Sequence, residues 1–401
     1  MPDGSLISAA LFALFVWIGH GAIWLIVTNR LNASGMLRPV VKSLTLAGHA
    51  LQISLPLWVG IRCWNGTLRF EDLPRLSSPG QWTSEPWLAP YFAACLLVAA
   101  VIVPMWAWRT FFRSPPARLV SEECRHFKLG GEDRSAWLHG LSARFFGAIP
   151  FNQILDLVVA EKTFSYPDLP RDLEGLRILH LSDFHLSGKI GREYFDEVLR
   201  RGMELRPDLV AITGDLCDRR KCLAWLPELV AKLRCRYGVY YILGNHDLLV
   251  NADDVRATMT AAGASDVAME PCEVEIGAAR LWIAGDERPW FKNETASSAP
   301  PQGSGVAPQA FRLLLSHTPD NWPWARRGGF DLMLAGHTHG GQIRLPLVGP
   351  LASPSWYGVL YTSGTFAFGR MMLHVSRGIS GLEPLRFNCP PEIALIVLHG
   401  E

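Results

Sequence analysis

Three long runs without a charged side chain occupy the N-terminal part of the chain and limit what it can fold into. They cover residues 5–28, 43–61 and 87–108. Each run is close to the roughly 20 apolar residues that a helix needs to cross the hydrocarbon of a bilayer. Trp87, Trp106 and Trp108 lie at the ends of the third run, where interfacial aromatic residues are usually found. We therefore predict three transmembrane helices within a membrane region of residues 1–114.

Two other interpretations of these runs are open. The first run is also compatible with a cleaved signal peptide, and the others with buried helices of a soluble protein. A signal peptide usually begins with basic residues, whereas only Asp3 precedes the first run. Pro56 interrupts the second run, which makes it the weakest of the three spans. Hydrophobic residues make up 49% of the chain and charged residues only 19%, which favours a membrane part joined to a soluble part and excludes general disorder.

The placement of lysine and arginine predicts the orientation of the chain. The basic residues near the ends of the three runs are Arg30, Arg38 and Lys42 after the first, Arg62, Arg69 and Arg75 after the second, and Arg109, Arg113, Arg118, Arg125 and Lys128 after the third. Because basic residues concentrate on the cytoplasmic side, this bias places residues 109–401 in the cytoplasm. We expect an integral protein of the inner or cell membrane with a cytoplasmic catalytic part.

Residues 115–150 are expected to connect the membrane region to the soluble part. Pro115 and Pro116 end the third helix, because proline cannot continue the helical hydrogen-bond ladder. The stretch 135–146 mixes aromatic side chains with arginine and histidine. It is either an amphipathic segment lying on the bilayer or a helix packed on the soluble part.

Charge and cysteine content exclude several classes of protein. The 401 residues carry 38 basic and 37 acidic side chains, a net charge of +1, which argues against a nucleic-acid binder. The 8 cysteines contain no Cys-x-x-Cys pair, so a zinc ribbon and a thioredoxin motif are not expected. Their low density in a long chain also argues against a disulfide framework.

Short apolar runs that alternate with helical patterns begin at residue 176 and predict an α/β fold. Strands are expected at residues 176–181, 209–213 and 239–243, each followed by a helix, at 194–205, 223–233 and 252–262. Further strands are expected at 272–276, 280–284, 311–315, 331–334, 371–375 and 393–398. Residues 292–309 are rich in Ser, Ala, Pro and Gly and are predicted to form a surface loop.

Polar clusters follow five of these strands directly. Their candidate metal ligands are Asp183, His185, Asp215, Asn245, His317, His337 and His339. The carboxyl ends of parallel strands are where α/β sheets place their sites. Oxygen and imidazole donors without cysteine suit Mn, Fe or Zn, with Mn preferred here. Seven ligands with one shared carboxylate would serve two divalent cations, which can activate water and hold a phosphoryl group.

Each cluster alone is a weak signal. A lone histidine such as His317 is more often structural, and the pair Gly214-Asp215 also suits a turn. His337 and His339 are more informative, because alternate residues of an extended segment project to the same side. Five clusters that each end a strand are not explained by packing or turns.

The order of the motifs carries a resemblance to a known family. Asp-x-His at 183–185, Gly-Asp-x-x-Asp at 214–218, Gly-Asn-His-Asp at 244–247, the lone His317 and Gly-His-x-His at 336–339 follow one another along the chain. In this order they resemble the calcineurin-like metallophosphoesterase superfamily, over roughly residues 150–400. The resemblance implies a four-layer αββα sandwich of residues 151–401 around a dinuclear metal centre.

The same resemblance implies a role for each residue. Asp183, His185 and His339 would bind the first cation, and Asn245, His317 and His337 the second, with Asp215 bridging them. His246 would contact the phosphate and act as general acid. Asp247 would orient His246, hold it in one tautomer and raise its pKa, and Asp218 would support the ligands from behind.

A narrower resemblance concerns the substrate. Segments 150–152, 336–343, 375–378 and 389–393 are similar to a membrane-anchored branch that includes UDP-2,3-diacylglucosamine pyrophosphatases of lipid A synthesis. This similarity implies a lipid-linked pyrophosphate substrate, cleaved at the cytoplasmic face of the membrane. An anchor of three spans departs from that branch, for which a simpler anchor is expected. Arg377 is either a contact for a substrate phosphate or a structural arginine.

The leading hypothesis is a membrane-anchored hydrolase of a phosphodiester or pyrophosphate bond, whose partners are the bilayer and a phosphorylated small molecule, with no nucleic acid. One alternative keeps the chemistry and changes the substrate to a cyclic nucleotide or a phospholipid. Another alternative is a membrane scaffold or transporter subunit with a non-catalytic phosphoesterase domain. The complete set of candidate ligands argues against the scaffold.

Overall fold

The computed structural model describes residues 4–77, 87–131, 134–292 and 310–401. The chain divides into two compact units, Met1–Ser114 and Pro115–Glu401. The predicted surface loop 292–309 lies almost entirely outside the described residues.

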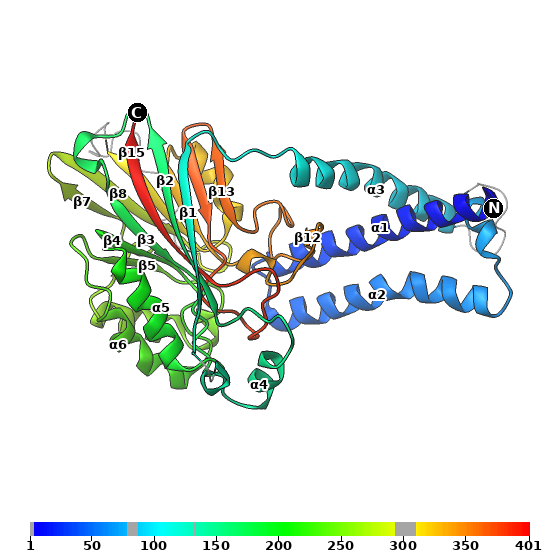
Figure 1. Ribbon diagram of the computed structural model, residues 1–401, viewed down its shortest axis with the longest axis horizontal. Helices are drawn as coiled ribbons and strands as arrows, with labels where there is room; N and C mark the ends of the chain where they lie inside the picture. The colour runs from blue at the N-terminus through cyan, green and yellow to red at the C-terminus, as the bar shows by residue number, and fades with distance from the viewer. Residues whose placement is uncertain (1–3, 78–86, 132–133, 293–309) are drawn as a thin grey trace. The chain divides into compact units, whose positions relative to one another are not determined.

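The first unit contains the three predicted apolar helices (Figure 1). They are α1 (Gly4–Asn32), α2 (Arg38–Trp64) and α3 (Leu88–Phe111), with a short 3-10 helix at Phe70–Ser77. All three helices are long and apolar enough to cross a membrane. α1 and α2 extend beyond both predicted bounds and α3 beyond its C-terminal bound, because charged flanking residues such as Arg38 and Arg62 still favour a helix.

Polar and small residues fix how α1 packs inside this unit. His20 of α1 is buried, and its ring nitrogens lie 2.5 Å from the Tyr91 hydroxyl of α3 and 2.9 Å from the Gln52 carbonyl oxygen of α2. A Cβ atom at Gly19 would lie 1.8 Å from the Cys95 carbonyl oxygen. Glycine at this position therefore lets α1 and α3 approach closely, as small residues do between membrane helices.

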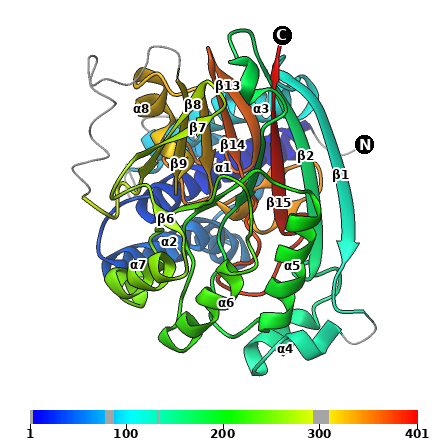
Figure 2. The ribbon, with the colours of Figure 1, turned by 90° about the vertical axis from the view of Figure 1, so that its left-hand side faces the viewer.

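The second unit is built on two large sheets (Figures 1 and 2). The seven-stranded sheet has the order β1-β2-β15-β3-β4-β5-β6, with β1 Leu119–Lys128, β2 Asp156–Tyr166, β15 Glu392–Gly400, β3 Arg177–Leu181, β4 Leu209–Thr213, β5 Val239–Ile242 and β6 Ser265–Asp266. The six-stranded sheet has the order β13-β14-β10-β9-β8-β7, with β13 Gly364–Phe368, β14 Met371–Val375, β10 Leu332–Ala335, β9 Phe311–Ser316, β8 Ala279–Asp286 and β7 Cys272–Ile276. A two-strand hairpin pairs β11 (Arg344–Leu345) with β12 (Gly349–Pro350).

Helices cover the outer face of each sheet, which gives the predicted αββα order of layers. The helices are α4 Leu141–Gly147, α5 Arg192–Glu204, α6 Leu226–Val230, α7 Ala252–Ala261 and α8 Trp322–Arg327. Apolar side chains of α5, α6 and α7 pack on the seven-stranded sheet, and those around α8 pack on the six-stranded sheet. A separate apolar core, which includes Ile178, Ile242 and Leu313, fills the space between the sheets. The predicted fold class is confirmed.

Six of the described strands were not predicted: the two-residue strands β6, β11 and β12, and the longer strands β1, β2 and β13. β1 forms within the segment expected to be a connector, and it is exposed along most of its length. Charged side chains on such an edge strand discourage pairing with another chain. β2 carries the buried Lys162 in the middle of its run, so its hydrophobic pattern is interrupted. β13 also lay outside the predicted strands.

One predicted helix is shorter than expected. Residues 223–233 were predicted as a helix, whereas the structure has a 3-10 helix at Arg220–Trp225 followed by the five-residue α6. Pro227 lies in the first turn of α6, where proline begins a helix but blocks its continuation from the preceding turn.

Candidate metal centre

The polar clusters lie together at the carboxyl ends of strands from both sheets. β3, β4 and β5 are parallel to one another, and so are β8, β9, β10 and β14. Their carboxyl ends therefore lie on one side, as the sequence predicted. The loops after β3, β4, β5, β9 and β10 carry all of the predicted ligands.

The backbone at these strand ends is strained. Five of the predicted ligands have a positive φ: Asp183, His185, Asp215, His337 and His339. Residues other than glycine seldom adopt this conformation, and it concentrates at functional sites. Close packing adds a constraint, because a Cβ atom at Gly244 would lie 2.3 Å from Oδ1 of Asp215. The chain thus bends sharply to bring the side chains to one centre.

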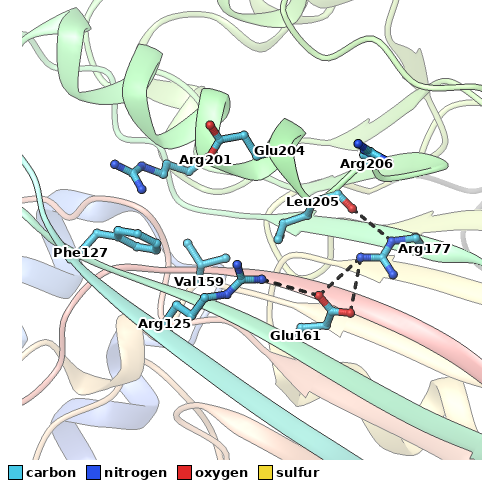
Figure 3. Close-up of a pocket in the computed structure, with 9 residues that line it drawn as sticks. All are labelled: Arg125, Phe127, Val159, Glu161, Arg177, Arg201, Glu204, Leu205 and Arg206. Atoms are coloured by element: carbon cyan, nitrogen blue, oxygen red, sulfur yellow. Dashed lines mark hydrogen bonds and ion pairs between the residues drawn. The ribbon is translucent and has the colours of Figure 1, made fainter.

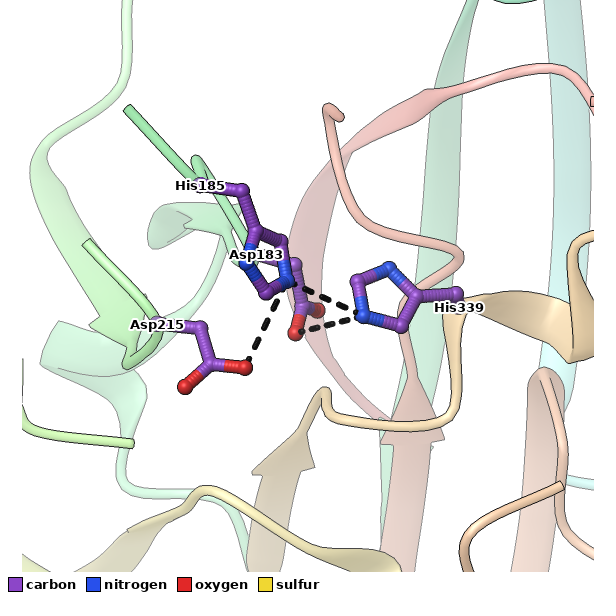
Figure 4. Close-up of side chains that lie close together, drawn as sticks. All are labelled: Asp183, His185, Asp215 and His339. Carbon is purple, nitrogen blue, oxygen red and sulfur yellow. Dashed lines mark hydrogen bonds and ion pairs between the residues drawn. The ribbon is translucent and has the colours of Figure 1, made fainter. Parts of the chain in front are cut away.

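The first group of side chains is Asp183, His185, Asp215 and His339, which come from three separate loops (Figure 4). One ligand atom from each lies within 4.8 Å of the others. The Nε2 atoms of His185 and His339 are 3.1 Å apart, and Oδ2 of Asp215 lies 3.4 Å from Nε2 of His185. Two imidazole nitrogens and two carboxylates facing one point are the donor set of a divalent cation.

The second group is Asp215, His317 and His337, with Asn245 beside it. Nε2 of His317 lies 3.1 Å from Oδ1 of Asn245 and 3.3 Å from Oδ2 of Asp215. Oδ2 of Asp215 and Nε2 of His337 are buried and have no hydrogen-bond partner among the described residues. Buried polar atoms without a partner are costly, and a cation between them would satisfy both. The residues therefore fit two cations that share Asp215.

Hydrogen bonds behind the centre orient the imidazole rings. Nδ1 of His317 lies 2.7 Å from the Thr213 carbonyl oxygen, and Nδ1 of His185 lies 2.9 Å from Oδ1 of Asp218. With Nδ1 held by these acceptors, the Nε2 atom of each ring faces the centre.

The pKa values show that the buried carboxylates of the site favour positive charge on the groups beside them. Burial alone would lower the pKa of His185, but the carboxylates of Asp218 and Asp215 raise it to about 9. Burial likewise opposes the charged form of His317, and Asp215 with Asp183 raises the pKa of its imidazole to about 9. Burial holds the pKa of His337 well below its usual value, so this ring is neutral and ready to bind a cation. Cations at the centre would replace the protons that otherwise balance these carboxylates.

Comparison with known proteins identifies the family. Residues 176–341 match the family model for calcineurin-like phosphoesterases. Phosphodiesterase YaeI of Escherichia coli is 32% identical over 235 residues, which cover 55% of this chain and 82% of the relative. The uncharacterized metallophosphoesterase YkuE of Bacillus subtilis is 32% identical over 254 residues, covering 60% of this chain and 85% of the relative.

The chain belongs to the calcineurin-like phosphoesterase family. A transmembrane protein with metallophosphoesterase domain from Bos taurus is 29% identical over 249 residues, covering 58% of this chain and 55% of that protein. The expectation of a metal-dependent phosphoester hydrolase is confirmed. The family also accounts for the pair of neighbouring cation positions.

His246 lies at the mouth of this phosphoesterase site, and its surroundings differ from the prediction. Its ring Nδ1 lies 2.9 Å from Oδ1 of Asp218, and its backbone N–H donates to Oδ1 of Asp215 over 2.7 Å. Asp247 instead accepts the backbone N–H groups of Leu216 and Cys217, both at 2.9 Å. The expectation that Asp247 orients His246 is therefore wrong. The Asp247 carboxylate instead links the loop after β4 to its own loop after β5 through backbone hydrogen bonds.

The expected rise in the pKa of His246 is also wrong. Burial lowers the pKa of this imidazole and outweighs the attraction of Asp215 and Asp218. The same Asp218 oxygen contacts His185 and His246, so this carboxylate supports one candidate ligand and the candidate acid at once.

Two other residues acquire clear surroundings in the structure. The half-buried ring of Trp290 lies 4.6 Å from the ring of His337 and 5.3 Å from that of His317, centre to centre. The sequence signal that could have marked Trp290 is its position in the segment that follows β8. Arg377, the other candidate, pairs with the buried Glu392, which makes it a structural arginine.

A cavity of about 440 Å³ lies away from the metal centre, between β1, β2, β3 and the end of α5 (Figure 3). Its lining includes four arginines and two glutamates. Glu161 lies 3.4 Å from Arg177 and 4.0 Å from Arg125, and Arg177 also donates to the Leu205 carbonyl oxygen. Glu161 thus pairs with two of the four arginines, and none of the lining residues is a predicted ligand.

Proposed function

We propose that this chain is a membrane-anchored hydrolase that cleaves a phosphodiester or pyrophosphate bond at a pair of divalent cations. The observation that carries the proposal is the position of Asp215, whose Oδ2 lies 3.4 Å from His185 of one group and 3.3 Å from His317 of the other. A single carboxylate between two sets of donors is what a bridged pair of cations requires. Mn²⁺ is the preferred pair of ions, with Fe and Zn as alternatives.

The side chains divide the work between holding and proton transfer. Asp183, His185 and His339 hold one cation and Asn245, His317 and His337 the other, while Asp215 contacts both. The bound pair supplies an activated water and positive charge for the phosphoryl oxygens. Asp218 accepts the Nδ1 hydrogen of His246, which leaves Nε2 to face the substrate. Nε2 would take up a proton from solvent to form the imidazolium and then deliver that proton to the leaving oxygen.

The proposed substrate is a lipid-linked pyrophosphate of the UDP-2,3-diacylglucosamine type, as in lipid A synthesis. Three helices that can cross a membrane and the similarity of segments such as 389–393 to that branch support it. A phospholipid or a cyclic nucleotide is the alternative, since the relative YaeI is named only as a phosphodiesterase.

The full-length protein, purified and loaded with Mn²⁺, tests this choice. We expect hydrolysis of the soluble diester bis(p-nitrophenyl) phosphate and release of UMP from UDP-2,3-diacylglucosamine. Hydrolysis of the soluble diester without UMP release would overturn the lipid-linked nucleotide as substrate and favour the alternatives. Absence of hydrolysis of every diester and pyrophosphate offered would contradict the proposed function.

We also propose that the catalytic unit lies on the cytoplasmic side of the inner or cell membrane. The arginines that follow α3, at positions 109, 113 and 118, support this orientation. Protease added outside spheroplasts should leave the phosphoesterase unit intact and should digest it after the membrane is opened. Digestion in intact spheroplasts would show the opposite orientation.

A further inference from the structure

Large apolar side chains project into solvent on two loops next to the metal centre. We call them the apolar rim: Leu141, Phe145 and Phe151 around α4, and Leu345, Leu347 and Val348 in the β11–β12 hairpin. Leu141 is 90% exposed, Phe151 83%, Leu347 79% and Phe145 67%. Scattered exposed leucines are ordinary on soluble proteins, but a contiguous apolar surface marks an interaction site.

Hydrogen bonds connect the two loops of the rim to one shared segment. On one side, the Asn152 side-chain amide donates to the Phe146 and Pro384 carbonyl oxygens, both at 2.8 Å. On the other, the Arg344 backbone N–H donates to the Phe387 carbonyl oxygen over 2.9 Å. Residues 384–387 thus contact the α4 loop through Asn152 on one side and the hairpin through Arg344 on the other.

The same segment connects the rim to the metal centre. The guanidinium of Arg386, buried in this segment, donates to the carbonyl oxygen of the candidate ligand His339 over 2.9 Å. The hairpin strand β11 begins five residues after His339. Whatever covers the rim therefore lies next to the entrance of the phosphoesterase site.

The charge of the rim indicates what covers it. Residues 138–153 and 342–361 contain no aspartate or glutamate, and each stretch carries one arginine, Arg144 and Arg344. The nearby Glu383 is neutralised by Lys189, whose ammonium lies 2.6 Å from its carboxylate. An apolar surface with the exposed Arg144 beside it and no free acid matches the boundary between acyl chains and anionic headgroups. Arg344 is half-buried, and its guanidinium donates to the Gly340 carbonyl oxygen and the Ser363 hydroxyl.

The length of the chain between the two units points to the same occupant. Only residues 112–118 separate the end of α3 from the start of β1. Even fully extended, such a linker spans about 25 Å, so the phosphoesterase unit stays at the surface of the bilayer that α3 enters. A bilayer is therefore always close to the phosphoesterase unit, whereas a protein partner would have to be recruited.

We propose that the apolar rim docks on the lipid bilayer and inserts its leucine and phenylalanine side chains among the acyl chains. This docking presents the metal centre to phosphoesters at the level of the lipid headgroups. The inference rests on the proposed function in taking α1, α2 and α3 as membrane spans and the centre as hydrolytic.

Photo-crosslinking of the full chain tests the docking directly. The photoreactive residue p-benzoylphenylalanine replaces Leu347 or Phe145 in protein reconstituted into nanodiscs of phosphatidylcholine with a minority of phosphatidylglycerol. The matched control replaces Met269, which is also exposed but follows β6 at the opposite edge of the seven-stranded sheet. We expect lipid adducts at positions 347 and 145 and none at 269. Adducts to protein alone, no adducts, or equal adducts at 269 would overturn the proposal.

Kinetic measurements distinguish a failure of the docking proposal from a failure of the proposed hydrolytic function. The double variant Leu347→Glu with Phe145→Glu should lower the ratio of hydrolysis of UDP-2,3-diacylglucosamine in nanodiscs to hydrolysis of bis(p-nitrophenyl) phosphate by about tenfold or more. Met269→Glu should leave this ratio unchanged. An unchanged ratio in the double variant would overturn the docking, whereas inactivity of the unaltered protein on both substrates, with lipid adducts still formed, would refute the proposed function and leave the docking supported.

Discussion

At the scale of single residues, Asp218 contacts two imidazoles of the site, those of His185 and His246, through one carboxylate oxygen. Motifs such as Asp-x-His place a ligand at a strand end, and the topology then brings the ligands together. Asp218 and Asp247 both flank the site in sequence, however, and only the direction of each side chain decides which one meets His246. Trp290 was open in the same way, because an aromatic residue after a strand suits a core as well as a site.

The shared role of Asp218 leads to a prediction. Asp218→Asn removes the charge that both His185 and His246 contact at 2.9 Å, so the candidate ligand and the candidate acid lose their orientation together. We expect kcat to fall by about 10–100-fold, together with weaker metal binding. Steady-state kinetics across metal concentrations measure both effects.

Asp247→Asn is the matched comparison for Asp218→Asn. Asp247 holds backbone N–H groups and not an imidazole, so its variant should lower thermal stability more than kcat measured on the folded fraction. Equal losses of kcat in the two variants would show that Asp218 has no special role.

At the scale of elements, regular apolar runs were predicted well and interrupted runs were not. β7 and β14 have the predicted bounds, because their residues follow an uninterrupted pattern. β2 was missed since Lys162 sits in its middle, where only the structure shows that Glu122 at 3.0 Å and Glu392 at 3.7 Å balance its charge. Compensating charges from distant strands cannot be read from a local pattern.

The buried carboxylate of β15 gives a prediction about stability. Burial opposes the charge of Glu392, but Arg377 and Lys162 outweigh it and hold the pKa of Glu392 well below its usual value. Its stabilising contribution is therefore present above about pH 4.3, the unfolded value, and is lost as the pH falls toward the folded pKa. Glu392→Gln should destabilise the unit by about 3–5 kcal/mol at pH 7, seen as a lower melting temperature.

The control for Glu392→Gln is the exposed partner of the same lysine. Glu122 is 42% exposed and pairs with Lys162 at the surface, so Glu122→Gln should cost about 1 kcal/mol or less. A loss of stability as large as that of Glu392→Gln would contradict the importance of burial.

The close approach of α1 and α3 gives a second prediction at this scale. Gly19→Val places a branched side chain where the Cys95 backbone lies, with a Cβ atom only 1.8 Å from its carbonyl oxygen. We expect the helices of the first unit to separate and the detergent-solubilised protein to melt at a lower temperature. Gly60→Val is the comparison, because a Cβ atom at Gly60 meets nothing within 4 Å. Equal melting temperatures of the two variants would contradict the packing.

At the scale of the whole molecule, two kinds of sequence pattern describe two units. Uncharged runs predicted the three apolar helices, and strands with polar ends predicted the phosphoesterase sandwich. The rim was not predictable as a surface, because it forms only when residues 384–387 bring α4 and the β11–β12 hairpin together. The membrane-borne substrate proposed above would use all three features: the apolar helices, the rim and the metal centre.

The metal content of the full-length protein tests the central claim most directly. After loading with Mn²⁺ and removal of free metal, elemental analysis should find about two cations per chain. Asp215→Ala should bind fewer than about one and lose nearly all activity, because both groups share its carboxylate. Asp168→Ala, at a carboxylate that is 76% exposed, should keep both cations and activity. Two cations retained by Asp215→Ala, or fewer than one bound by the unaltered protein, would contradict the account.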